Sequence, residues 1–130
     1  MTATITAEPV AVRQCWCRNC QQLSGGGPTH NAIFPADQVT LTGDLASHGH
    51  LAASGNTLTQ YFCPTCGTPA YATSSARLQF RTLRLGFLAP GHGLSPAAAI
   101  WTDSAPPWAV IDPALDQWPR QPPAPAVPQD

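Results

Sequence analysis

The chain has 130 residues, a formal net charge of −1 and an apolar fraction of 43%, and only 10% of its residues are charged. This length suits one domain with one hydrophobic core, and six Arg without a Lys are too few cations for a nucleic-acid-binding protein. No apolar run approaches the roughly 20 residues that span a bilayer, so no membrane role is expected. The N-terminus lacks the cationic start and long apolar run of a secretory signal, which predicts a cytoplasmic protein.

The chain is divided into short segments by 15 Pro and 10 Gly, which argues against long helices. Most segments have the composition and alternation of β-strands, so we expect a mainly β fold. The longest segment, 78–88, carries apolar residues at alternate positions and is expected to be a central strand. Short helical turns are expected after Cys20 and at 112–118. Further strands are expected at 31–34, 38–43, 56–62, 69–73, 97–101 and 108–111.

The C-terminal residues are dominated by Pro and contain few apolar side chains to bury. We therefore expect a single domain over residues 1–118, followed by a Pro-rich, extended and mobile tail over 119–130. The segment 47–56 contains His48 and His50 and is expected to be a polar hairpin loop.

The cysteines form two groups, and the first places Cys15, Cys17 and Cys20 within six residues. If Cys15 and Cys17 are extended, their sulfurs face the same side, and the C-x-x-C turn brings Cys20 back toward them. The second group, Cys63 and Cys66, has the Pro and Gly that favour a tight metal-binding turn.

In a reducing compartment, an odd number of thiols is more typical of metal ligands than of disulfides, although cysteines are often simply buried. Zinc is the metal that thiolate-rich sites most often select. The two groups either meet through the fold or bind different ions.

The motifs CWCRNCQQLSGG, FPADQVTLTGD, QYFCPTCGTPAYA, LRLGFL and PPWAVID occur in the order and at about the intervals of a known family. Between about residues 10 and 118 the chain resembles the glutathione-dependent formaldehyde-activating enzyme family, also called the GFA or CENP-V/GFA domain. The resemblance implies a small Mss4-like β fold. It also implies that Cys15, Cys17 and Cys20 hold a zinc ion at the active site, and that Cys63 and Cys66 bind a structural zinc.

The chain departs from this family in two respects. In relatives, an earlier C-x-C-G supplies two further ligands of the structural zinc, but no Cys or His precedes Cys15 here. The structural zinc is therefore lost, or the second group recruits His48 or His50, or all the cysteines form one site. The second departure is that Trp16 and Ala99 stand where many relatives have His, and Trp16 is expected to shape the metal pocket.

The resemblance implies a carbon–sulfur lyase that acts on glutathione–aldehyde adducts, as an S-hydroxymethylglutathione synthase does with formaldehyde. A zinc ion held by three thiolates has a fourth position at which a small-molecule thiol such as glutathione binds as a thiolate. Glutathione carries two carboxylates, and in a chain without Lys the candidates to bind them are Arg18, Arg81 and Arg84. Each of these arginines also suits an ordinary surface role.

Two further functions are compatible with the sequence. One is a zinc-stabilised binding module without turnover, which a saturated four-cysteine site would favour. The other is a decayed paralogue that keeps the fold and one ion, and that forms a homodimer through a strand edge exposed by the missing N-terminal strands.

Overall fold

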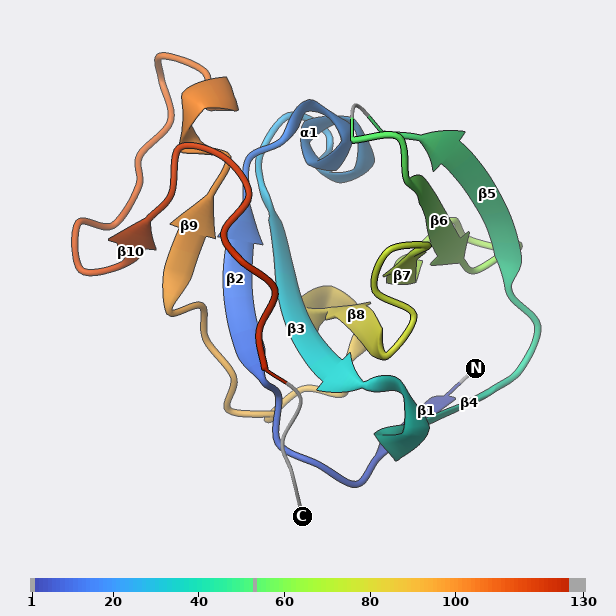
Figure 1. Ribbon diagram of the computed structural model, residues 1–130. Helices are drawn as coiled ribbons and strands as arrows, with labels where there is room; N and C mark the ends of the chain where they lie inside the picture. Colours follow the sequence, from blue (N-terminus) through green and yellow to red (C-terminus); the bar gives the residue numbers. More distant parts are fainter. Residues whose placement is uncertain (1, 53, 127–130) are drawn as a thin grey trace.

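The computed structural model describes residues 2–52 and 54–126. Strands dominate these residues, and the only α-helix among them is the seven-residue α1, Arg18–Ser24 (Figure 1). This confirms the expected mainly β fold. The strands are β1 Thr2–Ile5, β2 Ala11–Cys15, β3 Thr29–Pro35, β4 Val39–Thr42, β5 Ala46–Leu51, β6 Thr57–Phe62, β7 Pro69–Ser74, β8 Phe80–Arg84, β9 Ala98–Ile100 and β10 Asp116–Gln117, with 3-10 turns η1 Ala36–Gln38, η2 Leu85–Phe87 and η3 Thr102–Ser104.

Two sheets form the fold. The larger has eight strands in the order β10-β9-β2-β3-β8-β7-β6-β5, and β1 pairs with β4 in a separate two-stranded sheet. Neighbouring strands are antiparallel except at β9, which runs parallel to both β2 and β10. Among the described residues, no helix is long and apolar enough to cross a membrane.

Strand β3 lies at the centre of the larger sheet and is covered on both faces. All its side chains are buried except His30. One face packs into the main hydrophobic core, where Ala32 and Phe34 of β3 join Leu83 of β8 and Tyr71 of β7. Apolar residues of β1 and β4 also contribute to this core. The opposite face of β3 carries Asn31 and the other residues that lie under the candidate site.

Strand β8 is central, as expected, but it is shorter than the segment 78–88. It ends at Arg84, and the chain then turns through η2. The expected strand at 108–111 does not form, because these residues have no pairing strand; Trp108 and Val110 are 67% and 89% exposed.

The expected polar loop around His48 is also corrected, since Ala46–Leu51 forms strand β5. Antiparallel pairing with β6, in which His48 lies opposite Gln60, gives this polar segment its hydrogen-bond partners. The expected helical turn at 112–118 instead contains a turn and the short strand β10. In that turn, Asp112 Oδ1 accepts a hydrogen bond from the backbone N–H of Ala114 at 2.9 Å.

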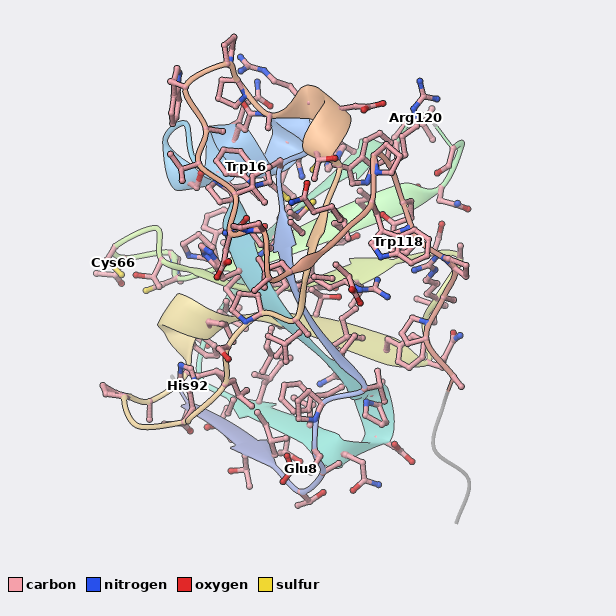
Figure 2. All side chains as sticks on the ribbon, turned by 90° about the vertical axis from the view of Figure 1, so that its left-hand side faces the viewer. Glu8, Trp16, Cys66, His92, Trp118 and Arg120 are labelled. Carbon is pink, nitrogen blue, oxygen red and sulfur yellow. The ribbon has the colours of Figure 1, made fainter. Side chains whose placement is uncertain are left out.

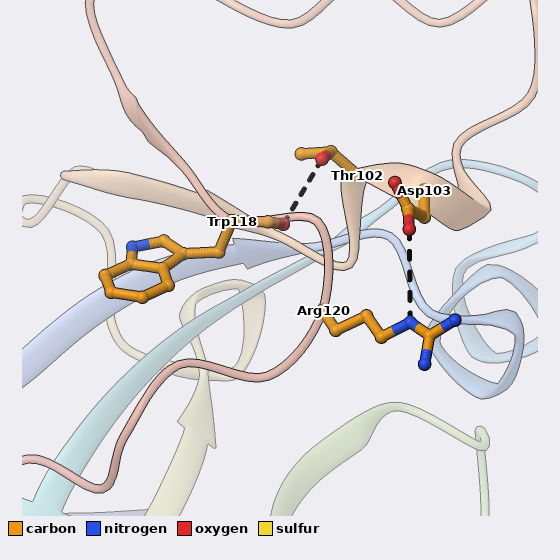
Figure 3. Close-up of polar contacts among 4 residues, drawn as sticks. All are labelled: Thr102, Asp103, Trp118 and Arg120. Atoms are coloured by element: carbon orange, nitrogen blue, oxygen red, sulfur yellow. Dashed lines mark hydrogen bonds and ion pairs between the residues drawn. The ribbon is translucent and has the colours of Figure 1, made fainter.

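The described part of the Pro-rich segment, 119–126, has no helix or strand and lies along η3. The carbonyl oxygens of Trp118 and Pro119 accept hydrogen bonds from the backbone N–H groups of Thr102 and Asp103 at 3.1 and 3.2 Å. Figure 3 shows a further bond from the Thr102 hydroxyl to the Trp118 carbonyl, and the ion pair between Arg120 and Asp103. Pro122 is buried, so the chain stays in contact with the fold beyond residue 119.

Candidate metal centre and adjoining cleft

Three cysteine sulfurs meet where strand β2 gives way to helix α1. Cys15 is the last residue of β2, Cys17 is the N-cap of α1, and Cys20 lies in its first turn. Their sulfur atoms all lie within 4.8 Å of one another. A tetrahedral zinc ion holds sulfurs at about 2.3 Å from itself, hence about 3.8 Å apart. The three donors therefore fit such an ion after small side-chain shifts.

The backbone around this cluster is held by hydrogen bonds. The N–H of Trp16 donates to the Ile100 carbonyl of β9 at 3.0 Å. The buried Gln21 amide donates to the carbonyls of Trp16 and Ser104, each at 2.8 Å. The first turn of α1 is closed by the Cys20 N–H, which donates to Cys17 Sγ at 3.4 Å. The cysteines are thus fixed by contacts to β9 and η3 and not by the local turn alone.

The three thiols influence one another strongly because they are close together and largely buried. Hydrogen bonds from the Cys15 and Cys17 thiols lower the pKa of Cys20 well below its usual range. The pKa of Cys15 is raised by its hydrogen bonds with Cys17 and Cys20 and by burial. One thiolate is therefore favoured without a cation, whereas ionisation of all three sulfurs requires a positive charge between them.

The cysteine cluster lines a cleft of about 650 Å³. Four of the six arginines line this cleft, and no Asp or Glu among the described residues does, although the chain as a whole has a net charge of −1. Apolar side chains form much of the remaining wall, and these include Ile33, Leu58, Phe80, Ile100 and Trp101. The cleft therefore suits an anionic ligand that also has an apolar part.

Strand pairing places the cysteine and arginine side chains in neighbouring rows of one sheet face. Cys15 on β2 lies opposite Thr29 on β3. One step along the same face, Arg13 lies opposite Asn31, which in turn lies opposite Arg84 on β8. Alternate residues of a strand are about 7 Å apart. The cross-strand row that contains Arg13 and Arg84 therefore lies next to the row that contains Cys15.

Arg84 is a buried cation that has only neutral partners. It is 8% exposed, and its Nη2 donates to Gln60 Oε1 at 2.7 Å, while its Nη1 donates to Asn31 Oδ1 and to Thr29 Oγ1. Its buried Nε has no partner among the described residues. No carboxylate of the described residues lines the cleft to balance its charge. After the hydrogen bonds from Cys15, Cys17 and Thr29, this charge also lowers the pKa of Cys20.

Of the arginines proposed for glutathione binding, Arg18 and Arg84 line the cleft and Arg81 does not. Arg81 is directed to the other face of β8, where its Nη1 donates to the Val39 carbonyl at 3.1 Å and its guanidinium lies 5.7 Å from the Tyr71 ring centroid. Residues three apart on a strand point to opposite faces, so Arg81 and Arg84 cannot serve one site from β8.

Two further arginines in the cleft, Arg13 and Arg77, were not among the expected site residues. The position of Arg13 was predictable from the sequence, because it precedes Cys15 by two positions and so shares its face of β2. The position of Arg77 was not predictable, since it lies in the turn between β7 and β8 and only the packing of that turn brings it to the cleft.

Cys63 and Cys66 form the expected turn but lie apart from the first group. Gly67 adopts φ +78 and its N–H donates to the Cys63 carbonyl at 2.8 Å, which closes the turn after β6. Figure 2 shows Cys66 on the opposite side of the molecule from Trp118. Within residues 2–52 and 54–126, the group of three or more potential metal ligands contains Cys15, Cys17 and Cys20 alone. A metal role for the second group stays a prediction. Cys63 and Cys66 do not join the first cluster, and neither His48 nor His50 completes a group of three ligands with them.

The tryptophan beside the cysteine cluster is Trp101 and not the expected Trp16. Trp16 is 3% exposed and directs its indole N–H to Gln14 Oε1, on the side of the strand away from Cys15. Trp101 packs against the cysteine cluster and lines the cleft. No local pattern indicates this position, because Trp101 reaches the site through the parallel pairing of β9 with β2.

The fold and the cleft together define a small β protein with a candidate three-cysteine metal centre. The family model described as glutathione-dependent formaldehyde-activating enzyme (GFA) matches residues 1–104. This match spans most of the chain, so the protein belongs to the GFA family and has its Mss4-like β fold. A search of curated proteins finds no match.

Proposed function

We propose that this protein is a zinc-dependent carbon–sulfur lyase that acts on glutathione–aldehyde adducts. The observation that carries the proposal is the set of three sulfur donors that opens onto an arginine-lined cleft, with no fourth protein ligand among the described residues. A structural zinc is saturated by four protein ligands, whereas a catalytic one keeps a position open. Membership of a family that includes carbon–sulfur lyases supports the same conclusion.

In this proposal the cysteines hold the metal and the arginines orient the substrate. Cys15, Cys17 and Cys20 bind the ion as thiolates, and the uncancelled charge of Arg84 stabilises these anions from below the cluster. When bound, zinc supplies a position for the substrate sulfur and lowers its pKa, so that it serves as nucleophile or leaving group. Arg18, an exposed residue that lines the cleft, attracts a carboxylate of the thiol, and the apolar wall contacts the carbon part of the adduct.

The experiment is to replace the metal with cobalt and to follow the thiolate-to-metal absorption bands while glutathione is added. We expect the bands to change and the loaded protein to turn over a mixture of glutathione and an aldehyde. The Cys66→Ser variant is the matched control, because it removes a thiol outside the cluster. Unchanged bands together with no turnover would refute the proposal.

The alternative of a zinc-stabilised binding module receives less support. It depends on a saturated site that includes Cys63 and Cys66, and these residues do not join the cluster of three within the described part of the chain. An ion that retains four cysteine ligands in solution, measured by X-ray absorption, would nevertheless favour it over catalysis.

A further inference from the structure

The cleft contains two arginines whose side-chain donors are not used by the protein. Arg13 on β2 and Arg77 in the β7–β8 turn both line it, and both are half-buried. Neither guanidinium donates a hydrogen bond or forms an ion pair with any residue in 2–52 or 54–126; the ion pair in that part of the chain joins Arg120 to Asp103. By contrast, Arg84 has its two terminal nitrogens committed to neighbouring side chains.

The surroundings of these two cations point to an anionic ligand. Both guanidinium groups line the same cleft, and no carboxylate of the described residues lines it to balance their positive charge. Bringing two half-buried guanidinium groups together without an anion costs free energy in the empty protein. An anionic ligand between them recovers this cost and accepts the fork-shaped pair of hydrogen bonds that each arginine offers.

The sheet fixes the backbone distance from one of these arginines to the cysteine cluster. Arg13 lies on the same face of β2 as Cys15, two residues away, so its Cα is about 7 Å from that of Cys15. A ligand that reaches from the cysteines to Arg13 therefore needs its sulfur and its anionic group only a few bonds apart. A thiol peptide with a carboxylate on the residue next to its cysteine has this arrangement.

We propose that Arg13 and Arg77 form a carboxylate subsite that binds a terminal carboxylate of the thiol substrate while its sulfur lies at the cysteine cluster. The identity of the ligand as a peptide thiol rests on the proposed function, whereas the anion subsite itself rests on the unused donors and on the lack of an acidic partner. Arg84 contributes charge from beneath this subsite and is not a direct ligand.

The test uses S-methylglutathione, which keeps both carboxylates but has no thiol to bind a metal. Its binding to the zinc-loaded full chain is measured by calorimetry for wild type and for Arg13→Gln and Arg77→Gln. We expect each variant to weaken binding about tenfold, as loss of a charged bidentate contact does. The matched control is Arg120→Gln, which removes one cation outside the cleft and should leave binding unchanged.

The Arg77→Gln variant keeps the test valid if substitution in β2 disturbs folding, because Arg77 lies in a turn; unchanged zinc content and circular dichroism establish its fold. Binding within twofold of wild type in Arg77→Gln, or no binding to wild type, would overturn the subsite.

If binding depends on the arginines but glutathione and aldehyde mixtures are not turned over, the lyase proposal fails and the subsite stands. If turnover is normal and binding is insensitive to both arginines, the subsite alone fails.

Discussion

The indole Nε1 of Trp101 donates a hydrogen bond to Gln121 Oε1 at 3.0 Å, and both residues line the cleft beside the cysteine cluster. Trp101 has φ 56, the left-handed conformation that a non-glycine residue seldom adopts, and this conformation costs on the order of 1 kcal/mol. The contacts of 118–121 with η3 offset this cost. Because the family match ends at residue 104, this part of the cleft wall is built by a segment beyond the matched residues.

Replacing Gln121 with Ala should loosen the C-terminal segment. The substitution removes the side-chain bond to Trp101, which is worth about 1 kcal/mol, so neighbouring bonds should open roughly fivefold more often. Hydrogen exchange of the Trp101, Thr102 and Asp103 amides, which donate to the carbonyls of 118–120, measures this opening. Gln22→Ala, at an exposed position of α1, is the control and should leave these rates unchanged; equal rates in Gln121→Ala would contradict the prediction.

Removing one sulfur of the first cluster should abolish metal binding there. We expect Cys20→Ala to lose the ion, because two thiolates hold zinc much more weakly than three. Cys63→Ala should keep this ion, because Cys63 lies outside the cluster. Metal content per chain under reducing conditions, determined by elemental analysis, distinguishes these outcomes. Loss of the same single ion from both variants would mean that the two groups share one site in solution.

Replacing Arg84 with Met should destabilise the zinc-loaded protein by about 2–4 kcal/mol, because Asn31 and Gln60 each lose a charged donor at a buried position. The substitution also removes the cost of burying the Arg84 charge. In the zinc-loaded protein, however, the nearby cysteine thiolates attract this charge, so its loss should still destabilise the fold. Urea denaturation measures the effect. Arg81→Met, on the opposite face of β8, is the matched control and should cost about 1 kcal/mol for its bond to Val39. Equal losses in the two variants would argue against the special environment of Arg84.

The metal-free protein should be most stable near the ordinary pKa of a thiol, about 8.5. Below that pH, the lowered pKa of Cys20 leaves the unfolded chain with one more bound proton, so stability rises with pH by up to about 1.4 kcal/mol per unit. Above it, the raised pKa of Cys15 reverses the sign, because the native state then keeps a proton that the unfolded chain loses.

Melting temperature against pH for chelator-treated wild type and Cys20→Ala tests this prediction. Burial lowers the pKa of His30, which also raises stability with pH on the acid side, but His30 is present in both proteins. The difference between the two curves therefore isolates the cysteines. Parallel curves from mildly acidic to neutral pH would show that Cys20 is not a thiolate in the metal-free fold.

The sequence was sufficient for those features that depend on residues close together in the chain. The period of two along a strand and the reversal at C-x-x-C were enough to bring Cys15, Cys17 and Cys20 to one point, and the dense Pro and Gly were enough to predict a mainly β fold. The motifs around these cysteines were also enough to identify the GFA family. In each case the spacing of a few residues fixes the geometry, because short segments have few conformations open to them.

Tertiary structure alone decided which distant residues complete the site. Arg77, Trp101 and Gln121 reach the cleft from a turn, from strand β9 and from the C-terminal segment, and no local pattern indicates where those elements pack. The pairing of β5 with β6 likewise turned a polar, loop-like segment into a strand, since backbone hydrogen bonds to a neighbour outweigh local preference. The separation of Arg81 from Arg84, by contrast, follows from the period of two along β8 and was within reach of the sequence. The physical reason is that long-range contacts are selected by the burial and hydrogen bonding of the whole chain and not by its neighbouring residues.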